Sequence, residues 1–174
     1  MRADAQRNRA SITDAALLVF SEHGGAASME TIAHRAGLSV GALYRHFPDR
    51  RTLVEHIAVD ALRDLLAFAQ RARDDPDPTR WEALRAVVVH CVGLPLAMTR
   101  TLRETPEAGP VVAELITRTN AILERLTLDA QREGSVRGDL TAADIVRVLE
   151  FAVCRPGARA EDPLLTVVLD GLRS

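Results

Sequence analysis

Polar side chains that could contact a charged partner gather in residues 28–50, around two short stretches of helical period, about 29–36 and 40–46. The two stretches meet in a tight turn, which needs a residue that tolerates a positive φ, and Gly37 supplies it. Ser39 can cap the second stretch, and the backbone N–H groups at such a helix start are suited to phosphate. The spacing therefore predicts a helix-turn-helix unit, the arrangement that places a helix against DNA.

The turn brings the two short helices close together, so a small residue is needed where they cross. Ala33, four residues before Gly37, fits that requirement. The small core expected beneath them consists of Ile32, Ala36, Leu38 and Leu43, packed against Ile12, Val19 and Phe20 of a preceding helix. The residues left on or near the open face of the second short helix are Ser39, Val40, Gly41, Ala42, Tyr44 and Arg45.

This segment resembles the TetR family of bacterial transcriptional regulators. The matching residues are Thr31-Ile32-Ala33, Ala36-Gly37-Leu38-Ser39, Gly41-Ala42-Leu43-Tyr44, His46-Phe47, Asp49-Arg50 and Leu53. The resemblance covers about residues 5–55, under a third of the chain. It implies a DNA-binding head attached to a helical body whose last two helices form a dimer interface.

The resemblance also implies which residues contact DNA. They are Ser28, Thr31, Val40, Gly41, Ala42, Tyr44, His46 and Arg50. Val40, Gly41 and Ala42 fall where the family meets base edges, and the others where it meets the phosphate backbone. Many members have a polar or basic residue in place of Val40 and threonine in place of Ala42, so this helix offers few hydrogen-bond donors to bases. Arg45, or contact with thymine methyl groups, would then carry more of the sequence readout.

Three of these aromatic or ring-bearing residues also have a purely structural interpretation. Tyr44 could be an ordinary amphipathic residue at a helix edge, and His46 and Phe47 could belong to the core.

The charge distribution agrees with a nucleic-acid-binding N-terminal segment, because this segment is positively charged and the rest of the chain is negatively charged. Residues 1–51 carry seven arginines against five carboxylates, a net charge of +2, whereas the whole chain of 174 residues has a net charge of −2. All 22 basic residues are arginine. Two cysteines give neither a disulfide framework nor a metal cluster. The polar stretch 1–11 is no signal peptide, and no apolar run spans a membrane, so we expect a cytoplasmic protein without metal or cofactor.

Helical period runs through the whole chain, with no stretch of alternating polar and apolar residues that would indicate a strand. We predict an all-α fold of about nine helices. The expected helices are one around residues 12–20 that ends at Gly24, then 29–36, 40–46, 50–73, 78–92, 95–104, 111–133, 142–154 and 163–171. Four of the later ones have expected N-terminal caps, namely Asp49, Asp77 followed by Pro78, Thr141, and Asp162 followed by Pro163. They form a helix-turn-helix domain, 1–52, and a helical ligand-binding and dimerisation domain, 53–174.

The body offers a row of apolar residues that serves either as the core of a bundle or as the wall of a ligand cavity. The candidate ligand contacts are Phe68, Trp81, Val88, Cys91, Met98, Asn120 and Phe151. Asn120 is the polar candidate, because Ile116 and Glu124 on neighbouring turns place it beside the apolar stripe. No charged run lies on the inner face, so the expected effector is a largely apolar, uncharged or weakly polar small molecule.

The last two helices are apolar over far more than the ~100° stripe of a surface helix. A monomer would expose the excess as a large patch, whereas a two-fold partner buries it in a four-helix bundle. We therefore expect a homodimer through residues about 141–173. The alternative is that both helices belong to the core of a monomer.

The leading interpretation is a homodimeric, ligand-responsive repressor that binds a two-fold symmetric DNA operator and has no catalytic activity. An activator, or a regulator without a ligand, is the alternative within the same class. A helical protein that binds or sequesters a small molecule without specific operator binding is the alternative from another class. Enzymes are disfavoured, because no nucleophile elbow, phosphate-binding loop, dinucleotide fingerprint or zinc-binding histidine pair is present.

Overall fold

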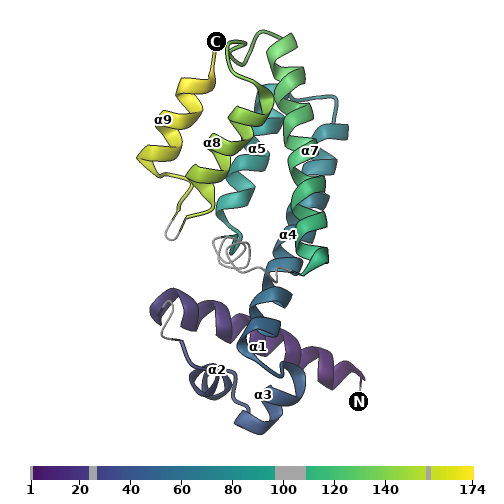
Figure 1. Cartoon of the computed structure of the whole chain (residues 1–174), viewed down its shortest axis with the longest axis vertical. Helices are drawn as coiled ribbons and strands as arrows, with labels where there is room; N and C mark the ends of the chain where they lie inside the picture. Colours follow the sequence, from purple (N-terminus) through teal and green to yellow (C-terminus); the bar gives the residue numbers. More distant parts are fainter. Residues whose placement is uncertain (1, 24–26, 97–108, 156–157) are drawn as a thin grey trace. The chain divides into compact units, whose positions relative to one another are not determined.

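The computed structural model describes residues 2–23, 27–96, 109–155 and 158–174, and over these ranges it is all-helical (Figure 1). The helices are α1 (Arg2–His23), α2 (Met29–Arg35), α3 (Val40–His46), α4 (Arg50–Asp74), α5 (Arg80–Val92), α7 (Pro110–Arg132), α8 (Ala142–Val153) and α9 (Pro163–Leu172). The predicted all-α class is confirmed. The helix expected over 95–104 falls mostly outside the described residues.

The chain divides into two compact units, residues 1–57 and 58–174. Helix α4 begins in the first unit and continues into the second. The boundary expected after residue 52 falls a little earlier, inside α4.

The first unit is a three-helix core closed by the start of α4. Ile12, Ala16 and Val19 recur at the spacing of one helical face, and all three are fully buried on α1. Ile32 of α2 and Leu43 of α3 are also fully buried. Ala36, Leu38 and Phe20 were predicted to belong to this core, but they are only half-buried and lie at its edge.

The turn between α2 and α3 has the geometry that its glycine predicts. Gly37 adopts a positive φ of 69°, directly after the last residues of α2. The Leu38 N–H donates to the Ala33 carbonyl at 3.0 Å, and the Gly37 N–H donates to His34 at 3.1 Å. These bonds satisfy the open carbonyls of α2 and reverse the chain, so that α3 can begin at Ser39.

We expect Gly37→Ala to lower the free energy of unfolding by about 1–2 kcal/mol, because an L-residue is strained at this positive φ. A Cβ built on Gly37 meets no atom within 4 Å, so the cost comes from the backbone alone. Urea unfolding measures it. Gly41→Ala is the control, since Gly41 has equally open surroundings and no positive φ. An equal loss at both positions would contradict the explanation.

The second unit packs α5, α7, α8, α9 and the later part of α4 around one aliphatic core. Leu84 of α5, Leu126 of α7 and Ile145 of α8 are fully buried there. Trp81 is buried in the same core. The Val136 and Arg173 backbones form an isolated antiparallel bridge, which ties the turn after α7 to the end of α9.

The start of α5 corrects one expectation. Asp77 and Pro78 were expected to cap this helix, but it begins at Arg80 with Thr79 as its cap. The Thr79 hydroxyl accepts from the Glu82 N–H at 3.2 Å, and the Glu82 carboxylate accepts from the Thr79 N–H at 2.9 Å. This reciprocal capping box satisfies two open N–H groups, one more than an aspartate cap alone, and it lowers the pKa of Glu82 below its usual value.

The other expected caps are confirmed. The Asp49 carboxylate accepts from the Thr52 N–H at 2.7 Å at the start of α4. The Thr141 hydroxyl accepts from the Asp144 N–H at 3.1 Å before α8. Asp162 accepts from the Leu164 N–H at 2.9 Å, with proline in the first turn of α9.

Candidate functional site

The helix-turn-helix unit leaves the predicted face of α3 open. Val40 and Tyr44, one helical turn apart, are 39% and 40% exposed, whereas Leu43 between them is fully buried. Gly41 and Arg45 are exposed as well. The apolar side of α3 therefore packs on the core of the unit, and its opposite side is accessible to a binding partner.

Two helix starts bring hydroxyl groups to the same unit. The Ser28 hydroxyl accepts from the Thr31 N–H at 3.1 Å and lies 3.0 Å from the Thr31 hydroxyl. The Ser39 hydroxyl accepts from the Ala42 N–H at 3.2 Å. Thr31 and Ser39 are exposed, and Ser28 and Ala42 are half-buried. These groups stand where the expected phosphate contacts need donors.

Arg50, at the first residue of α4, is positioned by an aromatic ring. Its guanidinium carbon lies 5.0 Å from the centre of the Phe20 ring of α1. A guanidinium stacked on a ring keeps its N–H groups at the edge, where they can still donate to phosphate. The contact does not follow from the sequence pattern, which predicts Phe20 as a core residue alone.

The structure separates the three residues that have a structural alternative. Tyr44 is exposed on α3. Phe47 is fully buried and packs 5.3 Å from the His56 ring, so it is a core residue. His46 is half-buried, between the core and the surface. Arg9 adds a guanidinium 5.0 Å from the Phe47 ring.

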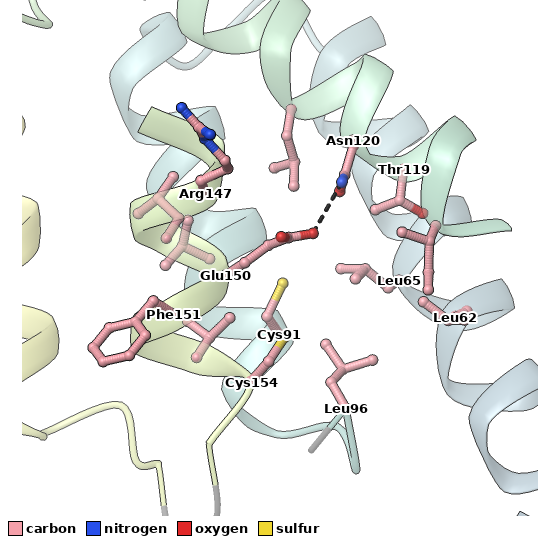
Figure 2. Close-up of a pocket in the computed structure, with 15 residues that line it drawn as sticks. Leu62, Leu65, Cys91, Leu96, Thr119, Asn120, Arg147, Glu150, Phe151 and Cys154 are labelled. Atoms are coloured by element: carbon pink, nitrogen blue, oxygen red, sulfur yellow. Dashed lines mark hydrogen bonds between the residues drawn. The ribbon is translucent and has the colours of Figure 1, made fainter. Parts of the chain in front are cut away.

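The second unit contains a cavity of about 450 Å³ bounded by α4, α5, α7 and α8 (Figure 2). Its lining residues are Leu62, Leu65, Val88, Cys91, Leu96, Ile116, Thr119, Asn120, Leu123, Arg147, Leu149, Glu150, Phe151, Val153 and Cys154. The lining is mostly aliphatic with a few polar groups, as is common for small-molecule sites.

The candidate ligand contacts fall in different places. Val88, Cys91, Asn120 and Phe151 are among the lining residues. Met98 lies outside the described residues. The other two candidates pack elsewhere. Phe68 stacks on the His90 ring at 4.1 Å, and Trp81 packs in the core with the Arg173 guanidinium 6.0 Å from its ring.

Eleven of the lining residues are not among the predicted ligand contacts, and one of them, Glu150, accepts a hydrogen bond from a predicted contact. The Asn120 Nδ2 donates to Glu150 Oε1 at 2.9 Å across the cavity wall (Figure 2). The two residues stand on α7 and α8, so only packing brings them together. A signal was present, because Glu150 interrupts an otherwise apolar run, 148–153, on α8.

Cys91 and Cys154 both line the cavity but differ in accessibility. Cys91 is buried, which raises the pKa of its thiol to about 12, with a smaller contribution from Cys154. Burial disfavours the charged thiolate, the form that reacts with electrophiles and oxidants. Cys154 is half-buried.

We expect iodoacetamide at pH 8 to alkylate Cys154 and to leave Cys91 unmodified in the folded chain. At that pH only about one Cys91 thiol in ten thousand is ionised, given a pKa of about 12. Peptide mapping by mass spectrometry reads both sites, and urea-unfolded protein, in which both react, is the control. Equal labelling rates in the folded chain would contradict this assignment.

Helices α8 and α9 divide their apolar residues between two faces. Ile145, Leu149 and Leu165 are buried in the protomer. Phe151 and Val167, in contrast, are 70% and 69% exposed. We call the exposed set the α8–α9 apolar face; its members are Val148, Phe151, Leu164 and Val167.

Two family models match the chain. The model for bacterial regulatory proteins of the TetR family matches residues 12–57, and the model for the C-terminal domain of SbtR-like transcriptional regulators matches residues 75–174.

Individual proteins agree with these models. The crystal structure of a TetR transcription regulatory protein from Mycobacterium vanbaalenii is 30% identical, with a TM-score of 0.67 over 99% of both chains. The TetR transcriptional regulator SCO0520 from Streptomyces coelicolor is 32% identical, with a TM-score of 0.65 over 95% of this chain and 98% of that one. The HTH-type transcriptional regulator UidR of Escherichia coli strain K12 is 28% identical in an alignment 159 residues long, which covers 86% of this chain and 79% of UidR.

A helix-turn-helix unit with an open α3, followed by a helical body, defines a DNA-binding transcriptional regulator. The chain belongs to the TetR family of bacterial transcriptional regulators. Within the described ranges no helix is long and apolar enough to cross a membrane. In the same part of the chain, no group of three or more histidine, cysteine, aspartate or glutamate side chains could hold a metal ion.

Proposed function

We propose that this regulator is a ligand-responsive repressor that binds a two-fold symmetric operator as a homodimer and has no catalytic role. The observation that carries the proposal is the division of α3, whose Leu43 is buried while Val40 and Tyr44 remain exposed beside it. A helix held in this way can enter a major groove with its other face toward the bases. Acting on bacterial DNA, the protein would work in the cytoplasm.

In this proposal the exposed residues of the first unit have two tasks. Val40, Gly41 and Ala42 meet base edges, and Arg45 supplies the hydrogen bonds that those three lack. The phosphate backbone is held by Ser28, Thr31, Ser39, Tyr44, His46 and Arg50. Because no phosphate contact carries sequence information, readout depends on the short apolar surface around Val40 and on Arg45.

The second protomer would pair through the α8–α9 apolar face. Four large apolar side chains exposed on two adjacent helices are unfavourable in water, and a two-fold axis lets each copy bury those of the other. Pairing within residues about 141–173 would place two heads on one operator, as a two-fold symmetric sequence requires.

The cavity would bind the effector, a largely apolar small molecule. Leu62 and Leu65 of α4 line it, and the same helix begins at Arg50 in the first unit. A ligand that binds one position of α4 better than another would therefore act on the head through one continuous helix, and it would weaken operator binding by its differential affinity.

One observation favours a second candidate function. Val40 and Ala42 give α3 few donors toward bases, which fits a protein that binds a small molecule without recognising an operator. The two functions differ in DNA binding alone, because both use the cavity.

A gel-shift titration on DNA from upstream of the protein's own gene separates them. We expect a complex that survives excess unrelated DNA and weakens steeply as salt rises, because phosphate contacts release counterions. Binding that the unrelated DNA removes completely would favour the second function.

A further inference from the structure

We propose that Arg9 of α1 is a further phosphate contact in the DNA complex, beside the C-terminal end of α3. The inference rests on the proposed operator binding and adds a residue from a helix to which that proposal assigns no DNA contact. It concerns affinity for any duplex, because a phosphate contact carries no sequence information.

The Arg9 side chain is held by an aromatic ring. Its guanidinium carbon lies over the Phe47 ring, 5.0 Å from the ring centre. Phe47 is fully buried and packs against His56, so the ring has a fixed position. The contact of Arg50 with Phe20, also at 5.0 Å, repeats this arrangement in the same unit. A side chain ordered in this way loses less entropy when it binds, and a guanidinium over a ring keeps N–H groups at its edge for an anion.

Among the described residues, no ion pair or side-chain hydrogen bond engages the Arg9 guanidinium. Arg7 on the same helix, in contrast, pairs with Asp4. Asp49, two residues after the ring, uses its carboxylate to cap α4, where it accepts from the Thr52 N–H at 2.7 Å and from the Thr52 hydroxyl at 2.9 Å. Arg9 is exposed, so its charged group is accessible to an anion from outside the protein.

The position of this cation fits the border of the major groove. In the proposed complex the first residues of α3, 40–42, meet base edges. A helix of seven residues is about 10 Å long and the groove is about 12 Å wide, so the other end of α3 lies near the phosphates that border the groove. Phe47 is the C-terminal cap at that end, and Arg9 lies over its ring. The preceding residue, His46, is already among the proposed phosphate contacts.

A purely structural role is the alternative, in which Arg9 covers the Phe47 ring and its charge has no partner in the complex. The two roles differ in their effect on salt dependence. Each phosphate that the protein neutralises contributes about 0.9 to the slope of log affinity against log salt. Removing one such charge from each protomer of a dimer should therefore reduce the slope by about 1.8, whereas a structural role leaves the slope unchanged.

Fluorescence-anisotropy titration at several salt concentrations tests the inference, with the full-length protein on the duplex used in the gel shift and on an unrelated duplex of equal length. Arg9→Gln keeps an aliphatic stem and a planar amide near the ring but removes the charge. We expect it to bind both duplexes about tenfold more weakly, with the reduced slope and with an unchanged preference between them. Arg9→Lys retains the charge and should keep the slope of the wild type.

Arg7→Gln is the matched control, because it makes the same change of charge two residues away, on the opposite side of α1. Its slope should stay close to that of the wild type. A second measurement needs no variant: DNA should protect Arg9, but not Arg7, from modification by phenylglyoxal, as read by peptide mapping.

Four results would overturn the inference: a wild-type slope in Arg9→Gln, an equal loss of slope in Arg7→Gln, a slope in Arg9→Lys as small as that of Arg9→Gln, or no protection of Arg9 by DNA. The preference of the wild type for its operator over the unrelated duplex reports separately on the proposed regulator function. A wild type that keeps this preference while Arg9→Gln keeps the wild-type slope loses this inference alone.

Discussion

A Tyr44→Phe, Arg50→Ala double variant should keep its fold and lose most of its affinity for operator DNA. Arg50 is held beside Phe20 at the start of α4, and Tyr44 is exposed on α3, so both are placed for phosphate in the proposed complex. Loss of a charge-assisted hydrogen bond costs about 1.5–3 kcal/mol and loss of a neutral one about 0.5–1.5 kcal/mol. A dimer loses each contact twice.

The measurement is a fluorescence-anisotropy titration at several salt concentrations. The variant should show a weaker dependence of affinity on salt, because fewer counterions are released. Arg118→Ala is the matched control, since it removes one arginine of the second unit that pairs only with Glu114 at 3.6 Å among the ion pairs described. Circular dichroism checks the fold, because Arg50→Ala also removes the contact with Phe20. Wild-type affinity in a folded double variant would refute the assignment of these two contacts.

The second large effect is expected at the α8–α9 apolar face. Val167→Glu should convert a dimer into a monomer, because it places a charge where the partner's apolar side chains would pack. The side chain is 69% exposed in the protomer, so the monomer should remain folded. Operator affinity should fall by about 10²–10⁴, the range by which linking two binding sites exceeds single-site binding.

Sedimentation equilibrium at micromolar concentration gives the mass of each species, to be compared with the 19.0 kDa chain. Val111→Glu is the matched control, because Val111 is also exposed but lies at the start of α7, outside this face. Leu165→Glu serves a different purpose. It buries a carboxylate in the protomer and should unfold the chain. A wild type that sediments at 19.0 kDa and still binds DNA tightly would contradict the proposed dimer.

Helix positions were predictable where single residues determine them. Gly37 needs a left-handed turn and Thr141 and Asp162 offer their side chains as caps, so these ends follow from local chemistry. At α5 two local signals competed. The reciprocal bonds of Thr79 and Glu82 prevailed over Asp77 and Pro78, and only the energetic comparison of the two caps separates them.

The candidate site was predictable only where neighbours in sequence form it. The exposed face of α3 follows from helical period, since buried Leu43 fixes which side Val40 and Tyr44 occupy. The cavity joins four helices, and its polar pair, Asn120 and Glu150, comes from two of them. Helical periodicity in the sequence places a residue on one face of its helix, but it does not tell which neighbouring helix covers that face.

Helical periodicity is limited in the same way for α8 and α9, because it does not tell which of their apolar residues the rest of the protomer covers. Their excess of apolar residues predicted exposed apolar side chains, and four large ones are exposed. Which side chains these are depends on how each helix is turned against the body, so Phe151 and Val167 are exposed while Leu165 is buried.

The proposed operator binding is tested most directly by a hydroxyl-radical footprint of the wild-type protein on DNA selected from a random pool. We expect one preferred, two-fold symmetric sequence, protected in two half-sites whose centres are roughly 34–36 Å apart, with one dimer bound. A pool without a preferred sequence, or a single protected half-site occupied by a 19.0 kDa monomer, would contradict it.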